Sequence, residues 1–202
     1  MPFGQAHRDH DCGGGTVIRI NTPLSLEARR KLTTGERCLI TGEILTARDA
    51  AHARLVAALS RGEELPIDLE GQLIYYVGPC RPYSGQVIGS AGPTTSGRMD
   101  PFTEALLRYG MAGTIGKGRR SLAVKAAMQV HEAIYLAATG GAGALLAKTI
   151  QRCELLLYPD LGPEAIYRLQ VVDFPVVVAI DSQGNDLYES GPLNWSNGQE
   201  QG

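Results

Sequence analysis

Three loops that contain glycine carry hydroxyl or cationic side chains directly before a segment expected to be helical. The richest is residues 92–100, with the sequence Gly-Pro-Thr-Thr-Ser-Gly-Arg-Met-Asp. Consecutive Thr94, Thr95 and Ser96 place hydroxyls and backbone amides around one point. Arg98 adds a planar cation whose donors match a carboxylate. This loop therefore predicts the binding of an anion.

The second loop, residues 116–120, has the sequence Gly-Lys-Gly-Arg-Arg. Its glycines let the backbone approach a ligand, and Lys117 can reach that ligand. The Gly-x-x-x-x-Gly-Lys-Ser/Thr spacing of a nucleotide-binding P-loop is missing, so a nucleoside triphosphatase is disfavoured. A solvated basic loop is the plainer alternative for this segment.

The third loop begins a helix predicted over residues 46–59. Thr46 and Asp49 have the spacing of a capping box, which would place Arg48 in the first helical turn. A cation there opposes the helix dipole by about 0.3 to 1 kcal/mol. Either Arg48 is solvated and tolerates that cost, or Arg48 and the helix terminus hold an anion together. His52, one turn later, could be a general acid, a substrate contact or a histidine satisfied at the surface.

Each loop alone has a plain structural explanation, and residues 94–97 could be only a hydroxyl-rich turn. Three such loops in one small domain favour anion binding more strongly, because ligands of α/β proteins gather at the ends of strands. His131, at the end of an amphipathic helix, is expected to be structural.

The elements that must position these loops alternate between strands and helices. The predicted helices cover residues 25–32, 46–59, 100–110, 122–131 and 143–150. Ser25 is the predicted N-cap of the first of them. The predicted strands cover residues 17–20, 38–45, 73–77, 86–88, 114–115, 133–137, 153–158, 167–172 and 175–180. This alternation predicts one α/β domain over residues 16–190, with a mixed sheet and flanking helices. Residues 1–15 are predicted to be a flexible leader and residues 191–202 a flexible tail.

Composition narrows the class of protein. The chain has 202 residues, 44% of them hydrophobic, with 19 Lys and Arg against 21 Asp and Glu. That size suffices for one core, and the balanced charge argues against nucleic acid or an anionic membrane as the main partner. No apolar run approaches the roughly 18 residues of a membrane span, and the first residues do not resemble a secretory signal. A cytoplasmic protein is expected.

The four cysteines lie far apart and none forms a Cys-x-x-Cys pair; they are Cys12, Cys38, Cys80 and Cys153. Neither a zinc ribbon nor an iron-sulfur cluster site is therefore expected within the chain. The reading of His7, His10 and Cys12 as metal ligands is weak, because three glycines follow at once. No metal ligand is predicted.

Residues 91–100 resemble the signature of the class I, iron-sulfur-dependent fumarate hydratases and the related L-tartrate dehydratases, in their β subunit or C-terminal domain. The similarity extends over residues 17–188. Further matching segments are 46–52, 75–79, 116–118, 140–141, 164–166, 173–175 and 181–188. A match of this length is far more specific than a short motif. The leader before Val17 has no counterpart recognised in the family.

The resemblance implies a domain similar to the swivelling β/β/α domain of aconitase-like hydro-lyases. It also implies a [4Fe-4S] cluster held by three cysteines of an α subunit, in an α2β2 assembly, and not by this chain. Arg48, Arg98 and Lys117 would then hold the dicarboxylate substrate, and Thr94 would be the base at the carbon that loses a proton. Further substrate contacts would come from Thr95, Ser96 and His52.

The reaction that this family implies is reversible hydration of fumarate to malate, a step of the tricarboxylic acid cycle. Dehydration of L-tartrate to oxaloacetate is the alternative, because Ser96-Gly97 and Arg119-Arg120 depart from the related fumarase and tartrate dehydratase sequences and leave the substrate open. A third reading is a non-catalytic subunit that binds an anion or supports assembly.

Overall fold

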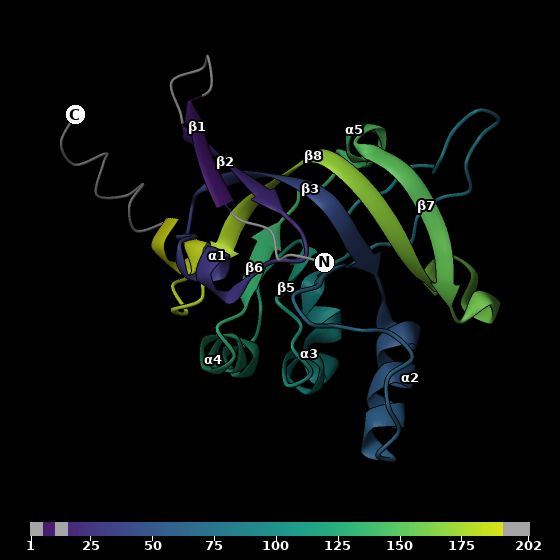
Figure 1. Ribbon diagram of the computed structural model, residues 1–202, viewed down its shortest axis with the longest axis horizontal. Helices are drawn as coiled ribbons and strands as arrows, with labels where there is room; N and C mark the ends of the chain where they lie inside the picture. The colour runs from purple at the N-terminus through teal and green to yellow at the C-terminus, as the bar shows by residue number, and fades with distance from the viewer. Residues whose placement is uncertain (1–5, 11–15, 192–202) are drawn as a thin grey trace.

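An eight-stranded mixed sheet organises residues 6–10 and 16–191, which are the part of the chain that the computed structural model describes (Figure 1). The strand order is β1-β2-β3-β4-β5-β6-β8-β7. Strands β2 to β6 run parallel, whereas β8 is antiparallel to β3, β6 and β7. The strands are β1 Ala6–His10, β2 Thr16–Asn21, β3 Arg37–Thr46, β4 Leu73–Tyr75, β5 Gly113–Gly116, β6 Ile134–Ala137, β7 Ile150–Leu157 and β8 Ile166–Ile180. The predicted α/β class with mixed strand directions is confirmed.

The sheet closes on itself, because β3 and β8 also pair with each other. Strands β3, β4, β5, β6 and β8 thus form a ring. One core cluster includes Ile18, Ile40, Tyr75 and Phe174, and the other includes Leu55, Tyr76 and Tyr135, so the strands contribute alternate side chains to two cores.

Three helices lie side by side along one face of the sheet: α2 Asp49–Ser60, α3 Asp100–Leu107 and α4 Leu122–Val130 (Figure 1). The shorter helices are α1 Leu26–Arg30, α5 Gly143–Lys148, and the 3-10 turns η1 Ser96–Met99 and η2 Pro159–Glu164. The predicted N-cap Ser25 is confirmed, since its hydroxyl accepts a bond of 3.1 Å from the Ala28 amide.

The predicted capping box at Thr46 is wrong. Thr46 is the last residue of β3, and its buried hydroxyl lies 3.3 Å from the Ala165 carbonyl and 2.9 Å from the Tyr167 amide. Helix α2 instead begins at Asp49, with Arg48 directly before it. Its cap comes from a distant residue, because Glu164 accepts a bond of 3.3 Å from the Ala50 amide.

Two strand predictions also need correction. Residues 167–172 and 175–180 belong to one strand, β8. The strand continues through Asp173, although this residue adopts a left-handed conformation with φ of 53°. Residues 86–88 are not a strand and lie in the loop between β4 and η1, where only Ile88 of the three is buried. The helix predicted to end at Gly110 ends at Leu107.

Ordered structure begins earlier than predicted. Strand β1, Ala6–His10, lies inside the predicted leader and pairs antiparallel with β2. The rest of that leader, with Cys12, and all but Gly191 of the predicted tail lie outside the described residues.

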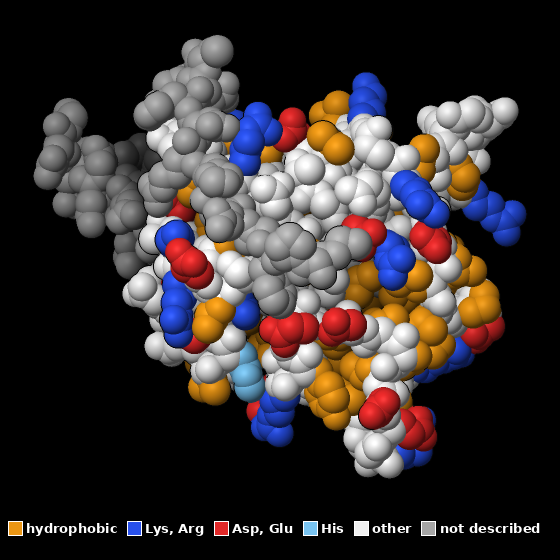
Figure 2. All heavy atoms as spheres, viewed as in Figure 1, with side chains coloured by type: hydrophobic (Ala, Val, Ile, Leu, Met, Phe, Trp, Pro, Cys, Tyr) orange, Lys and Arg blue, Asp and Glu red, His pale blue; other side chains and the backbone are white. Residues whose placement is uncertain are grey.

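The surface carries charges of both signs. Figure 2 shows acidic and basic side chains interspersed on one face, with hydrophobic side chains gathered toward its lower right. Among the helices of the described residues, none has the length and apolar character that crossing a membrane requires.

Candidate active site

The three predicted loops meet at the carboxyl ends of neighbouring parallel strands. Arg48 follows β3, Lys117 follows β5, and the loop after β4 leads to residues 94–98. Because these strands are parallel neighbours, their carboxyl ends share one edge of the sheet. The topology thus brings together residues that the sequence places up to 69 positions apart.

The hydroxyl loop is bonded to the lysine loop through the backbone. The Thr94 amide donates to the Tyr76 carbonyl at 2.7 Å, and the Lys117 amide donates to the Thr94 carbonyl at 3.3 Å. The Ser96 amide completes the connection with a bond of 2.8 Å to the Lys117 carbonyl. Thr94 and Lys117 are therefore held beside each other by main-chain bonds that do not depend on their side chains.

Gly116 makes this close approach possible. A Cβ atom at that position would lie 2.1 Å from the Ser96 Oγ and 3.1 Å from the Tyr76 ring. Real side chains cannot approach so closely. Glycine is thus required for contact between the two loops.

The two arginines are connected through Asp49. Arg98 donates from Nε to Asp49 Oδ1 at 3.0 Å, and its Nη2 lies 2.9 Å from Oδ2. Arg48 Nη2 lies 3.1 Å from Glu164 Oε1 and 3.8 Å from Asp49 Oδ2. Sequence reasoning missed both carboxylates: it assigned Asp49 to a capping box, and it matched Glu164 to the family without giving it a role.

Space beside Arg48 is kept open by another glycine. A Cβ atom at Gly78 would lie 2.8 Å from Arg48 Nη1, so a side chain there would displace the guanidinium.

Lys117 is exposed, as is Arg98. A Cβ atom at Gly140, which follows β6, would lie 3.6 Å from Lys117 Cδ, so the lysine stem extends along this glycine. Among the described residues, no carboxylate forms an ion pair with Lys117, in contrast to Arg48 and Arg98. Its ammonium is therefore available to an anionic ligand.

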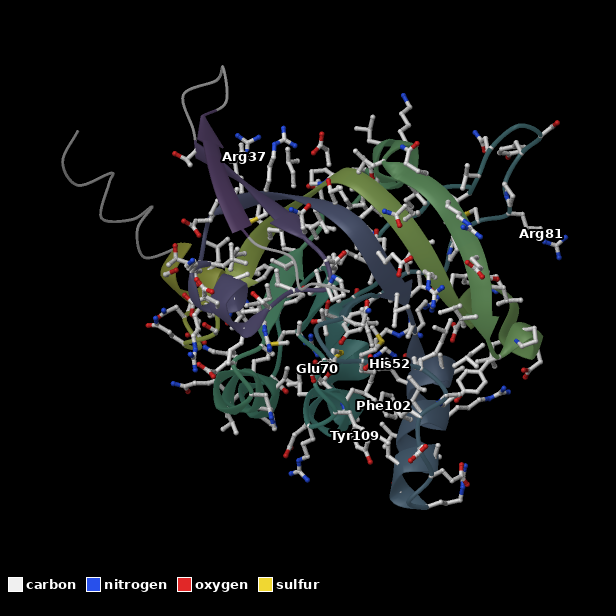
Figure 3. All side chains as sticks on the ribbon, viewed as in Figure 1. Arg37, His52, Glu70, Arg81, Phe102 and Tyr109 are labelled. Carbon is white, nitrogen blue, oxygen red and sulfur yellow. The ribbon has the colours of Figure 1, made fainter. Side chains whose placement is uncertain are left out.

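His52 and Ser96 do not face that ligand position. Both side chains are fully buried, and the Ser96 hydroxyl lies 3.0 Å from the Tyr135 hydroxyl. Figure 3 shows His52 between α2 and α3, with Phe102 beside it. Its Nδ1 lies 2.9 Å from the Arg48 carbonyl and must carry a proton, because a carbonyl only accepts. His52 is therefore placed to hold the turn at Arg48, and its burial does not fit the predicted substrate contact.

Burial lowers the pKa of His52 to about 4, and the nearby Arg120 cation also lowers it. The unfolded chain has a histidine pKa near 6.5, so it binds a proton that the folded chain excludes. With respect to His52, the free energy of unfolding is therefore at its full value above about pH 6.5 and falls as the pH drops toward 4.

We expect the wild-type chain to lose about 2 kcal/mol more free energy of unfolding between pH 7 and pH 5 than His52→Asn does. Asparagine cannot titrate but keeps a donor near Nδ1. Urea unfolding of both proteins at the two pH values measures the difference, and equal pH dependences would contradict a neutral buried His52.

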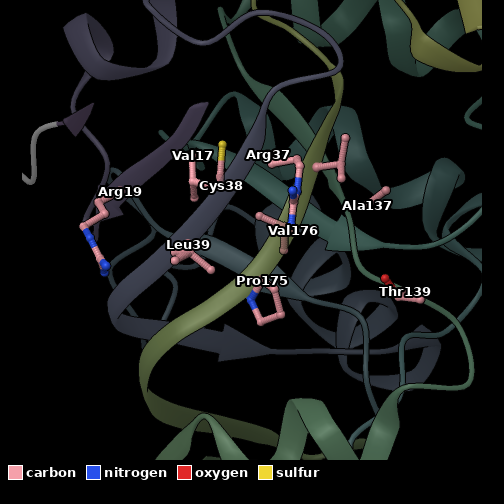
Figure 4. A pocket seen from close by; sticks show the side chains of 10 residues that line it. Val17, Arg19, Arg37, Cys38, Leu39, Ala137, Thr139, Pro175 and Val176 are labelled. Atoms are coloured by element: carbon pink, nitrogen blue, oxygen red, sulfur yellow. The ribbon is translucent and has the colours of Figure 1, made fainter. Parts of the chain in front are cut away.

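One well-formed cavity lies apart from this site. A cavity of about 350 Å³ lies among β2, β3, β6 and β8, and Figure 4 shows Arg19, Arg37, Leu39 and Pro175 around it. Its lining contains none of the predicted site residues. The cluster of Arg48, Thr94, Arg98 and Lys117 is instead an open edge of the sheet.

Within the described residues, no group of three or more His, Cys, Asp or Glu side chains could hold a metal ion. Cys38 is buried in the core, and burial raises the pKa of its thiol to about 12. Cys80 is exposed in the loop after β4, and Cys153 is half-buried on β7. These thiols do not form a set of three ligands.

Comparison with known proteins identifies relatives over most of the chain. The model of a family described as the fumarase C-terminus matches residues 4–191, and so includes most of the leader that was predicted to lack a counterpart. A Salmonella typhimurium protein named "Fumarate hydratase class I, aerobic" is 39% identical over 183 residues, which are 88% of this chain and 32% of that protein. A Leishmania major protein named "Fumarate hydratase 2" is 40% identical over 156 residues, which are 76% of this chain and 28% of that protein.

A shorter relative matches over most of its own length. The Methanocaldococcus jannaschii protein named "Putative L(+)-tartrate dehydratase subunit beta" is 38% identical over 166 residues, which are 79% of this chain and 85% of that protein. The chain spans about a third of the length of the fumarate hydratases that it matches.

Proposed function

Because the chain belongs to the family of the fumarase C-terminus, we propose that it is the dicarboxylate-binding part of a hydro-lyase that reversibly hydrates fumarate to malate. The observation that carries this proposal is the cluster of Arg48, Thr94, Arg98 and Lys117 at one open edge of the sheet. Three cations and one hydroxyl around a common space suit a substrate with two carboxylates and a proton to transfer.

The cations divide into two kinds. Lys117 supplies a mobile ammonium to one carboxylate. Arg98 gives Nε and Nη2 to Asp49, so its remaining Nη1 can donate to the other carboxylate. Arg48, held by Glu164, adds positive charge close by without being free to move toward the ligand. The substrate is thereby oriented between rigid arginines and a flexible lysine.

Thr94 is the proposed proton acceptor at the carbon that loses a proton. A threonine hydroxyl of ordinary pKa is a poor base. To accept that proton, Thr94 first loses its own hydroxyl proton to solvent and acts as an alkoxide. Neighbouring cations stabilise this negatively charged oxygen, and Lys117 is held beside Thr94 by the backbone. We propose that the same proton returns to carbon in the reverse reaction.

The implied iron-sulfur cluster does not fit the described cysteines of this chain. Cys38 lies in the core, and Cys38, Cys80 and Cys153 do not form a group of three thiolate ligands. We therefore propose that a partner α subunit holds the [4Fe-4S] cluster and closes over the open edge, in an α2β2 assembly in the cytoplasm. The β-subunit name of the Methanocaldococcus relative supports this division.

L-tartrate is the second candidate substrate. The relative with that name corresponds to this chain over most of its own length, unlike the longer fumarate hydratases. Tartrate also carries two carboxylates, so the same cations would hold it.

The test combines the chain with a partner that carries three cluster cysteines, which is to be sought in an adjacent reading frame. After anaerobic reconstitution with iron and sulfide, turnover of fumarate, malate and both tartrates is compared. We expect preference for fumarate and malate. Preference for L-tartrate would replace the substrate, and no turnover by an intact, loaded complex would favour a non-catalytic subunit.

The purified chain alone is expected to be colourless and inactive, because it lacks a set of cluster thiolates. Its absorption spectrum after the same reconstitution measures this. An iron-sulfur band from the chain without a partner would contradict the proposed division of labour.

A further inference from the structure

A fully buried arginine lies beneath the proposed site. Arg120 follows Lys117 by three residues, and its side chain has no exposed surface. Its guanidinium donates from Nε to Asp100 at 2.7 Å, from Nη1 to Thr114 at 2.9 Å, and from Nη2 to Thr103 at 2.7 Å. All three nitrogens are therefore used, by partners on two different elements, α3 and β5.

The guanidinium is also near two tyrosine rings. Its Cζ lies 5.5 Å from the centroid of the Tyr76 ring and 5.3 Å from that of Tyr135. A planar cation attracts aromatic faces at such distances, and arginine is well suited to this contact.

Each tyrosine connects Arg120 to the proposed site. The Tyr76 carbonyl accepts the Thr94 amide at 2.7 Å. The Tyr135 hydroxyl donates to the Gly118 carbonyl at 2.8 Å and lies 3.0 Å from the Ser96 hydroxyl. Tyr135 thus joins the hydroxyl loop to the lysine loop through side-chain bonds.

Asp100 makes a second connection. It is the first residue of α3 and follows Arg98 by two positions. One of its oxygens accepts from Arg120, and the other accepts from the Ser121 amide at 2.8 Å. The turn that carries Arg98 is therefore fixed to the segment that follows Lys117.

Packing alone does not require this arginine. Burying a charge is costly, and apolar side chains of similar volume often replace buried ion pairs without loss of stability. An apolar side chain could not donate three directed hydrogen bonds, one of them to Asp100, and at the same time place a cation beside the rings of Tyr76 and Tyr135.

We propose that Arg120 is a positioning residue, which fixes Thr94 and Arg98 relative to Lys117 and so sets the spacing at which a dicarboxylate is held. This rests on the proposed function of the same site. It adds a role for a residue that contacts no substrate.

Arg120→Ala removes the guanidinium and leaves a cavity beside two tyrosines. In the complex with the partner subunit, we expect kcat/KM per folded molecule to fall about 10²-fold. Added methylguanidinium should restore kcat/KM at least about fivefold, because the small cation can occupy that cavity. A residue that only supported folding would show lower thermal stability, with kcat/KM per folded molecule preserved and not raised by methylguanidinium.

Arg29→Ala is the matched control. Arg29 is also buried, but it belongs to α1 and donates to the Glu132 carbonyl at 3.2 Å, away from the site. We expect lower thermal stability, unchanged kcat/KM and no response to methylguanidinium. If Arg120→Ala does not fold, Tyr135→Phe replaces it: this variant keeps the ring and loses the hydroxyl that joins Ser96 to Gly118, and its KM should rise.

A readout without activity separates this inference from the proposed function. In Arg120→Lys, amide hydrogen exchange at Thr94, Ser96 and Lys117 should accelerate about tenfold or more, while the β7–β8 amides stay unchanged. If the wild-type complex turns over no substrate, the proposed function fails and this exchange measurement still tests the positioning role. Unchanged exchange at those amides, or wild-type kcat and KM in Arg120→Lys, would overturn it.

Discussion

Replacing Arg98 by lysine is expected to raise KM for the dicarboxylate by about 10- to 150-fold, which corresponds to about 1.5 to 3 kcal/mol of binding free energy. Arg98 is held by two of its nitrogens on Asp49 and offers a third to the ligand. A lysine ammonium cannot bond Asp49 in a forked geometry and keep a directed donor for substrate at the same time. Steady-state kcat and KM of the loaded complex measure the change.

Arg54→Lys is the matched control for this substitution. Arg54 lies on the same helix as Asp49 and also forms a forked pair with a carboxylate, that of Asp160, but outside the site. Its replacement should leave both kinetic constants unchanged. A wild-type KM in Arg98→Lys would remove Arg98 from the substrate contacts and leave it as a partner of Asp49 alone.

The fold could be predicted where the pattern is local. The alternation of apolar segments indicated the helices and most strands, and Ser25 was correctly identified as a cap because its bond spans three residues. Thr46 had an equally good local signal and is nevertheless part of β3. The cap of α2 is supplied by Glu164, 114 residues away, and no local spacing can reveal such a contact.

The site shows the same division between local and long-range information. Residue types and loop glycines indicated Thr94, Arg48 and Lys117 as candidates, and the parallel strand order explains why their loops meet. The carboxylates on Arg48 and Arg98 could not be predicted, because charge pairing depends on how η2 and α2 pack. His52 was expected near the ligand because it follows Arg48 by one turn. That turn directs its ring into the core between Tyr76 and Phe102.

The backbone bonds of Thr94 allow the effect of removing its hydroxyl to be separated from an effect on the loop. The backbone of Thr94 makes both bonds that fix its position, through its amide to Tyr76 and its carbonyl to Lys117. Within the described residues, no partner bonds to its hydroxyl. Valine has the same branched shape, so Thr94→Val should keep the loop in place while removing only the hydroxyl.

Thr94→Val is therefore expected to lower kcat about 10²-fold or more, with little change in KM, if the hydroxyl transfers the proton. Both kinetic constants and the melting temperature of the complex measure this. Thr149→Val is the control, since the Thr149 hydroxyl donates to the Leu146 carbonyl at the end of α5, outside the site. A fall in melting temperature with kcat preserved per folded molecule would make the Thr94 hydroxyl a structural group. An unchanged kcat would remove Thr94 from the chemistry and leave Lys117 and the arginines as a binding surface.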